Sequence, residues 1–393
     1  HVAGKLICEE NDEKMIARKA YRERRLKIDE TVTVDALSQL PFPTPVAPVV
    51  VPPSRSMTRP INDSVLDVAI LLAESPVLTW LLVVRIASSA LGVLSMLWLL
   101  GYKRKALVAH SNLTQLLTEH SLWVLLNCVF VLMDAIYVVY RREVWNNFDE
   151  IVYTGNFCFA IRAPETFAIY ATMLSFLAIS FERLAATVDY RTYESETMGR
   201  VVTYSLTLAQ IVIPAGAVAL DSWGYEWDEF FAYCSIVSQG NRDSVQVVLF
   251  ILFLSEGVAI AMLTYLLHVN KRRRLGRFNR AFSENYQIIE NVRMLRIVTP
   301  WVWCHLGINV LAIVVWSTYN LLNPIYDPYT FIILEEIISF MHLQGLIIPL
   351  IVFVRNRRHR ANTRRLLAEN HARNPEEHEK FVARYEAVIQ KGW

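Results

Sequence analysis

The fold is decided by Ser180-Phe-Glu-Arg-Leu-Ala-Ala-Thr-Val-Asp-Tyr-Arg-Thr-Tyr-Glu194, where a long apolar run ends and charged residues follow at once. No residue between Phe167 and Phe181 is charged, and Glu182 and Arg183 come directly after this run. Such a pair at the foot of an apolar helix can hold the helix to its neighbours by charge-assisted hydrogen bonds until a partner displaces them. The alternative is an ordinary helix end whose charges lie at the membrane interface.

Cys158 indicates how far this helix extends. It precedes Arg183 by 25 positions. A continuous helix would separate the two residues by about 37 Å. They would then lie at opposite faces of a bilayer.

The composition is that of a membrane protein, because 54% of the 393 residues are hydrophobic and they fall in long blocks. Seven blocks have about 20 residues or more, the length that a helix needs to cross the hydrocarbon core. They are Val77–Leu100, Ser121–Tyr140, Ile161–Phe181, Val201–Leu220, Val245–Leu267, Ile297–Thr318 and Tyr329–Val354. The sequence therefore predicts an all-α membrane protein, a bundle of seven transmembrane helices.

Lysine and arginine in the connections orient this bundle, because cytoplasmic loops are enriched in both residues. The connections on one side contain 20 of them and those on the other side contain 4. The richer side comprises 101–112, 182–200, 268–296 and 355–365, and the poorer side comprises 141–163, 221–244 and 319–328. We therefore expect the N-terminus outside and the C-terminus in the cytoplasm. A basic stretch at 14–27 argues the other way but lies far from the first span.

Three segments follow from these spans. Residues 1–74 are polar and rich in proline, and we expect a disordered tail there. Residues 75–354 form the seven-helix domain, and residues 355–393 form a cytoplasmic tail that begins with a short amphipathic helix. Asn62 starts an Asn-Asp-Ser sequence, a glycosylation site if that side is extracytoplasmic.

The five cysteines lack the paired spacing of a zinc site, and no metal site is expected. In the predicted topology Cys158 and Cys234 both lie outside, whereas Cys128 and Cys304 lie inside spans and Cys8 lies in the tail. A disulfide between Cys158 and Cys234 is the natural pairing in an oxidising compartment. The alternative is two free thiols.

Several ionisable residues lie within the apolar spans, where they are costly and usually face the bundle interior. They are Arg85, Asp134, Glu256, Glu335 and Glu336. One interpretation is a polar pocket in the outer half of the bundle, with Asp134 or Glu335 anchoring a polar ligand. The other is structural pairing, in which Arg85 neutralises Asp134 or Glu336.

Taken together, seven spans, an outer cysteine on the third span and an acid–Arg pair at its foot resemble a G-protein-coupled receptor. More narrowly, the chain is similar to nematode serpentine chemoreceptors of the Sra superfamily, with class epsilon (Sre) nearest. The resemblance covers about residues 75–393. It rests on Phe181–Thr187, Tyr193, Glu194, Tyr286–Arg293, His110, Asn112, Leu113, His120, Trp123, Phe381 and Trp393.

The resemblance implies a chemosensory receptor that binds an odorant or pheromone and activates a heterotrimeric G protein. The expected location is the plasma membrane of sensory cilia. Coupling and switching would fall on Glu182, Arg183, Tyr286, Arg293 and Pro349. The chain departs from rhodopsin-like receptors, because Leu and not Tyr follows Arg183, and Pro349 lacks the flanking Asn and Tyr.

Other functional classes find less support in the sequence. We expect no enzyme, because there is no His-Glu-x-x-His motif, no Gly-x-Ser-x-Gly elbow and no phosphate-binding glycine loop. No cofactor is expected, and the bilayer rather than nucleic acid is the expected surrounding partner. A transporter that uses the intramembrane acids is the alternative, although no internal repeat is visible and seven spans do not divide into two halves.

Overall fold

Long helices make up nearly all of the computed structural model, which describes residues 63–106, 111–144, 152–188, 196–275, 282–322, 327–338 and 340–373. These residues belong to one unit, Pro60–Trp393. The predicted glycosylation site at Asn62 lies outside the described residues, as do the basic stretch at 14–27 and the residues after Arg373.

Helices account for the spans because lipid offers no partner to backbone polar groups, and a helix satisfies them internally. By length and composition, seven helical segments within the described residues can cross a membrane, in agreement with the prediction. The helices are α2 (Asp63–Glu74), α3 (Pro76–Ala106), α4 (Ser111–Val144), α5 (Gly155–Val188), α6 (Glu196–Asp221), α7 (Arg242–Leu275), α8 (Phe282–Leu322), α9 (Pro328–Ile338), η2 (Phe340–Leu343) and α10 (Gln344–Arg373). The seventh span consists of α9, η2 and the first part of α10.

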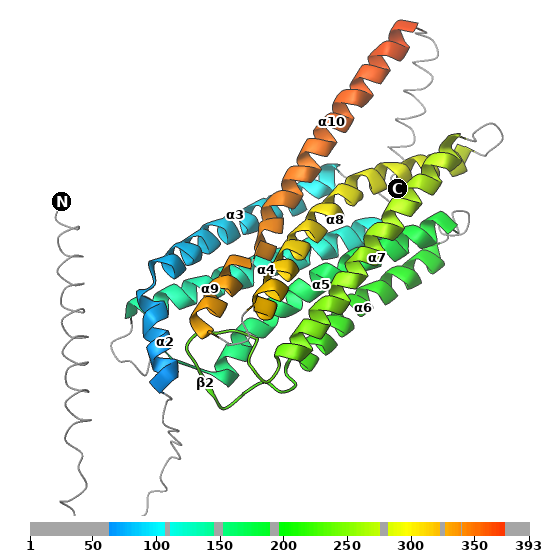
Figure 1. Ribbon diagram of the computed structural model, residues 1–393. Helices are drawn as coiled ribbons and strands as arrows, with labels where there is room; N and C mark the ends of the chain where they lie inside the picture. Colours follow the sequence, from blue (N-terminus) through cyan, green and yellow to red (C-terminus); the bar gives the residue numbers. More distant parts are fainter. Residues whose placement is uncertain are drawn as a thin grey trace, which may run out of the picture. The chain divides into compact units, whose positions relative to one another are not determined.

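Helix α5 is the centre of the bundle and packs against α4, α6, α7 and α8 (Figure 1). In its most apolar stretch 72% of the residues are buried, against 22–40% in the other six spans. Small buried residues, among them Ala171, Ser175 and Ala178, let the neighbouring helices approach closely. A charged side chain on α5 therefore meets protein rather than lipid.

The segment 1–74, for which the sequence predicts disorder, contains helix α2 at its end. Leu66, Ala69 and Leu72 are buried and recur every third residue, which is the spacing of one helix face. This face lies against α9 and β2 (Phe230–Phe231).

A short two-stranded sheet covers one end of the bundle. Strand β1 (Tyr153–Thr154) pairs with β2 in antiparallel register. The disulfide between Cys158 and Cys234 lies directly beside it, with 4.8 Å between the two Cα atoms, which confirms the predicted pairing. Gly155 begins α5 at this point, where a Cβ atom would come within 2.8 Å of the Trp227 carbonyl oxygen. We call this the disulfide end of the bundle.

The seventh span is interrupted by the 3-10 turn η2 before α10 begins. Pro349 has no N–H, so the carbonyl of Gly345 loses its partner within α10. Ser95 of α3 donates to that carbonyl instead, at 2.7 Å. The Cys128 thiol of α4 lies 3.4 Å from the carbonyl of His342. Neighbouring helices thus satisfy the backbone that the interruption exposes.

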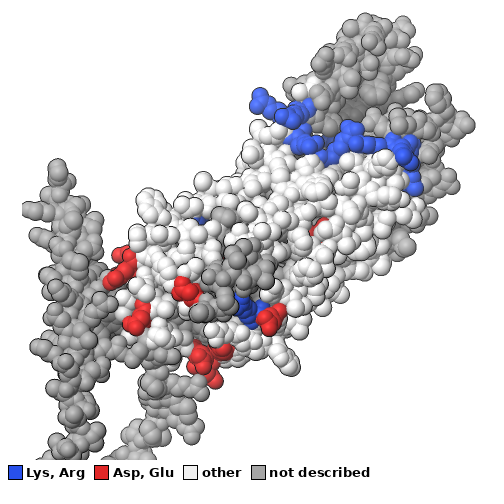
Figure 2. All heavy atoms as spheres, in the orientation of Figure 1, with Lys and Arg blue, Asp and Glu red and all other residues white. Residues whose placement is uncertain are grey.

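Exposed charges differ between the two ends of the bundle, as Figure 2 shows for the visible face. The exposed cations at one end are Arg200, Lys271, Arg272, Arg296, Arg355, Arg357 and Arg358. The exposed acids at the disulfide end are Asp67, Glu74, Glu143, Asp228, Glu229, Asp243 and Asp327. We call the first of these the basic end.

Candidate functional site

Five buried charged side chains meet within the disulfide half of the bundle, and we call them the ion cluster. Their exposed fractions lie between 3% and 6%. They come from four helices and are Arg85 of α3, Asp134 of α4, Arg162 and Glu165 of α5, and Glu336 of α9. The cluster therefore ties together spans that are far apart in the sequence.

Arg85 lies at the centre of three acids. Its Nη1 donates to both carboxylate oxygens of Glu336 at 2.6 Å, and its Nη2 donates to Glu165 at 2.9 Å. Asp134 Oδ2 lies 3.6 Å from the same Nη2. Arg85 thus contacts both acids that the pairing interpretation named, Asp134 and Glu336.

All three guanidinium nitrogens of Arg162 have partners. Nε donates to the Cys234 carbonyl at 2.9 Å, and Nη1 lies 3.1 Å from Glu165 and 3.2 Å from Asp134. Nη2 lies 3.4 Å from Glu336 and from the Tyr233 hydroxyl. The disulfide and the ion cluster are therefore one connected assembly.

Tyr233 adds a neutral donor to the cluster, because its hydroxyl donates to Glu336 at 2.7 Å. Burial and the neighbouring Glu336 carboxylate raise the pKa of Tyr233 well above its usual value. The hydroxyl therefore remains protonated and keeps donating.

Arg162 and Glu165 are not among the site residues predicted from the sequence. The predicted third span begins at Ile161 and leaves Arg162 among the loop cations, whereas α5 begins at Gly155. The spacing carried a signal, since Arg162 follows Cys158 by one helical turn and so lies on the same face as the disulfide. Glu165 lies three residues further on and completes that face.

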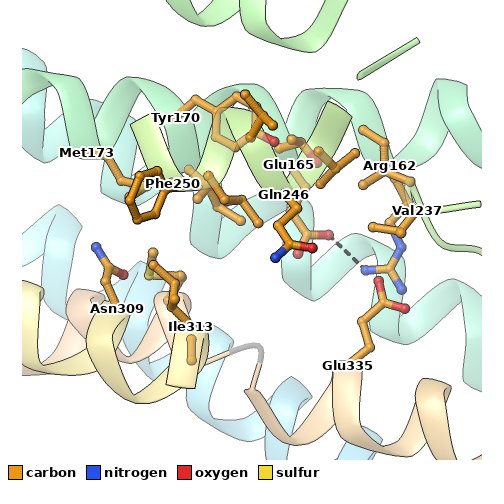
Figure 3. Close-up of a pocket in the computed structure, with 18 of the residues that line it drawn as sticks. Arg162, Glu165, Tyr170, Met173, Val237, Gln246, Phe250, Asn309, Ile313 and Glu335 are labelled. Carbon is orange, nitrogen blue, oxygen red and sulfur yellow. Dashed lines mark hydrogen bonds and ion pairs between the residues drawn. The ribbon is translucent and has the colours of Figure 1, made fainter. Parts of the chain in front are cut away.

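A cavity of about 560 Å³ lies beside the ion cluster, between α5, α7, α8 and α9 (Figure 3). Its lining is mainly apolar, and its polar and charged side chains come chiefly from the ion cluster, α7, α8 and α9. Apolar walls with a few polar groups are typical of small-molecule sites. Of the predicted pocket residues, Glu335 and Glu336 line this cavity, whereas Arg85, Asp134 and Glu256 lie behind its wall.

Two side chains in the cavity wall keep a buried oxygen without a hydrogen bond from any described residue, Glu335 Oε2 and Asn309 Oδ1. The other carboxylate oxygen of Glu335 accepts from Ser235 Oγ at 2.8 Å. The amide nitrogen of Asn309 donates to Glu256 at 2.6 Å, which leaves the amide oxygen on its other side.

Glu256 forms a second buried group with two residues of α8. Its Oε1 lies 2.6 Å from His305 Nδ1, and its Oε2 accepts from Asn309. Glu256 and His305 are almost fully buried. Glu256 therefore reaches the cavity only through Asn309.

At the basic end, Arg183 Nε donates to one carboxylate oxygen of Glu182 at 2.5 Å, and Arg183 Nη2 donates to the other. Its Nη1 donates to Asn291 Oδ1 of α8 at 2.7 Å. Glu182 and Arg183 are buried, so their side chains lie inside the bundle rather than at an interface. The contact with Asn291 connects the central helix to the sixth span.

The structure describes the side chains of two of the three other predicted coupling residues. Pro349 is buried in α10, and Arg293 is half-buried in α8. The Tyr286 side chain lies outside the described side chains. Asn291, which the sequence analysis did not single out, lies within the Tyr286–Arg293 stretch on which the resemblance rests.

Comparison with known proteins agrees with this architecture. Residues 66–390 match the family described as "Serpentine type 7TM GPCR receptor class ab chemoreceptor". "Serpentine receptor class alpha/beta-14" of Caenorhabditis elegans is 27% identical over 273 residues, which cover 66% of this chain and 68% of that protein. The match confirms a serpentine chemoreceptor and does not confirm class epsilon, which the sequence resembled most.

A family match over most of the chain, together with seven long apolar helices, identifies a multi-pass membrane protein with a receptor architecture. The chain belongs to the serpentine seven-transmembrane chemoreceptors of class ab, a family of the G-protein-coupled receptor type.

Proposed function

We propose that this protein is a chemosensory receptor of the plasma membrane, in sensory cilia, that binds an odorant or pheromone in the cavity beside the ion cluster. Ligand binding activates a heterotrimeric G protein at the basic end. One observation carries the proposal: the central helix α5 lines the cavity with Arg162 and Glu165 and holds α8 through Arg183 at its other end.

The proposed orientation has the N-terminus and the disulfide end outside and the basic end in the cytoplasm. The exposed cations of the basic end support it, because cytoplasmic ends of membrane proteins are rich in Lys and Arg. The disulfide supports it as well, since such bonds form in oxidising compartments. Residues 75–354 then form the receptor domain and residues 355–393 its cytoplasmic tail.

In this proposal the ligand selects between two arrangements of the bundle. In the arrangement described above, Arg183 is held by Glu182 and by Asn291 of α8. A ligand that binds better when α5 and α9 have shifted would favour an arrangement without the Arg183–Asn291 contact. The end of α8 would then be free to move away and expose the G-protein site.

The test is a ligand screen of cells that express the full chain, with G-protein activation as the readout. We expect a subset of small volatile or membrane-permeable compounds to evoke activation, and filling the cavity by Ile313→Phe to reduce it. Accumulation of a compound inside the cells without G-protein activation would contradict the proposal and favour a transporter.

A further inference from the structure

The cavity lies in a region with more acids than bases. Apart from the exposed Asp243, the acids of the ion cluster and of the adjoining cavity wall are Asp134, Glu165, Glu335 and Glu336, and the bases are Arg85 and Arg162. Their formal charges sum to −2. An isolated excess of buried negative charge is unfavourable, so the region gains from a bound cation.

Among the described residues that line this cavity, none offers an available cation to an anionic ligand. Arg162 is the base that lines it, and its five N–H groups face Cys234, Glu165, Asp134, Tyr233 and Glu336. Arg85 lies behind the wall and is bound to Glu336 and Glu165. Both guanidinium groups thus form ion pairs with acids of the protein, and Arg85 Nε, which has no hydrogen bond to a described residue, belongs to a side chain that does not line the cavity.

The buried atoms of the cavity wall that have no hydrogen bond also favour a ligand that donates hydrogen bonds. Among the buried side-chain atoms of the described lining residues, those without a hydrogen bond are Glu335 Oε2 and Asn309 Oδ1. Both are oxygen acceptors. Asn309 is 1% exposed, and Glu256 fixes the orientation of its amide. A buried acceptor without a donor costs free energy, which a ligand with N–H groups would recover.

The rest of the wall suits a hydrocarbon body. Figure 3 shows Glu335 and Arg162 at one end of the cavity, and Asn309 with Met173 and Phe250 at the other. Ile169, Met173, Phe250 and Ile313 contribute apolar surface. A volume of about 560 Å³ is that of a small-molecule site.

We propose that the ligand of this cavity is a small protonated amine, with its ammonium group on Glu335 and its apolar body along Met173, Phe250 and Ile313. A second donor group on a longer ligand would reach Asn309. This inference rests on the proposed function, since it names the ligand class of the same cavity.

The experiment uses the full-length receptor, purified in lipid nanodiscs, and measures its melting temperature with matched pairs of probes. The amines are hexylamine and benzylamine, and the neutral partners are hexanol and benzyl alcohol. We expect the amines to raise the melting temperature at concentrations at least tenfold lower than the alcohols do. A ligand that binds only the folded state stabilises it, so the shift reports binding.

Glu335→Gln removes the charge and keeps the size and the bond to Ser235. We expect this variant to bind the amines at least tenfold more weakly and the alcohols unchanged. Glu229→Gln is the matched control, because Glu229 is an exposed acid of the same end that does not line the cavity. If Glu335→Gln does not fold, Ile313→Phe provides the second test, and it should weaken amine binding by occupying the cavity.

Equal shifts from amines and alcohols, or full amine binding by Glu335→Gln or by Ile313→Phe, would overturn the inference. The measurement involves no G protein, so it separates this inference from the proposed function. Amine binding without signalling would contradict only the proposal that the protein is a receptor. Signalling evoked by alcohols but not by amines would contradict only the inference that the ligand is an amine.

Discussion

At the scale of single residues, the ion cluster shows how a membrane protein keeps charges in its interior. Arg85 and Arg162 share Glu165, Asp134 and Glu336, so each acid faces more than one base. Removing one member of such a group leaves the others buried and uncompensated, which costs far more than the group contributes when complete.

Arg162→Met should therefore destabilise the receptor by about 3 kcal/mol or more, because three acids and the Cys234 carbonyl lose a donor. Arg162→Lys should rescue only part of this loss, since one ammonium cannot reproduce the planar fork. Thermal unfolding of the purified receptor measures both. Arg296→Met, at an exposed position of α8, is the control and should unfold as the wild type does. If Arg162→Met unfolds at the same temperature as the wild type, the ion cluster does not stabilise the receptor.

The disulfide permits a second residue-scale prediction. Cys158→Ser and Cys234→Ser should each lower surface expression and melting temperature by the same amount, because either change breaks the same bond. The double variant should be no worse than either single variant. Additive losses would show that the two thiols act independently.

At the scale of elements, the sequence was most informative where the hydrocarbon core imposes a length. The seven apolar blocks predicted the spans because each must cover about 30 Å of lipid. It was least informative about which way a charge points, and the start of α5 shows this. Arg162 and Glu165 lower the hydropathy at the start of the predicted third span, although the structure buries both side chains.

Two further elements escaped the sequence analysis for physical reasons. Helix α2 follows a proline-rich segment, and its apolar face is short. The spacing of Leu66, Ala69 and Leu72 was therefore not recognised as a helix, and these residues were assigned to the disordered tail. The interruption at η2 is not visible in hydropathy, because three of its four residues are apolar and His342 is its one polar residue. Its stability depends on Ser95 and Cys128, which belong to other helices. The sequence of the seventh span alone does not reveal these contacts.

The interrupted span also permits a prediction about packing. A Cβ atom on Gly345 would lie 2.6 Å from Cys128 Sγ and 3.0 Å from Gly92 Cα, and a backbone cannot yield as a flexible side chain can. Gly345→Ala should therefore destabilise the receptor by about 1–3 kcal/mol. Gly257→Ala is the control, since nothing lies within 4 Å of its added Cβ, and should leave the melting temperature unchanged or raised. Equal melting temperatures for the two variants would contradict the close contact of α3, α4 and α10.

At the scale of the whole molecule, α5 makes the ligand cavity and the basic end parts of one body. Its residues line the cavity near one end and bond Asn291 near the other. Energetic coupling between distant sites needs an element whose equilibrium both sites bias. In the function proposed above, the Arg183–Asn291 contact is the part of this path that opens.

Arg183→Ala should abolish ligand-evoked G-protein activation while surface expression remains measurable, because it removes the group that the active arrangement would present. Asn291→Ala should instead raise activation without ligand several-fold, since it frees Arg183 from α8. Cell-surface labelling beside a G-protein assay separates the two effects. Full signalling by Arg183→Ala would end its assignment as a switch.

The orientation of the molecule permits a direct test. Epitope tags on the two termini should differ in antibody access on intact cells, with the N-terminal tag accessible and the C-terminal tag accessible only after permeabilisation. Access to both tags from the same face would contradict an odd number of crossings and with it the receptor architecture.

The bond from Arg162 to the Cys234 carbonyl has a consequence for biosynthesis. The disulfide joins Cys158, one helical turn before Arg162 on α5, to Cys234, whose backbone carbonyl accepts the hydrogen bond from Arg162. If the orientation is as proposed, this disulfide would form in the secretory pathway, and the same bond would hold in place one acceptor of the Arg162 guanidinium. We therefore expect a receptor with reduced cysteines to be retained before it reaches the cell surface.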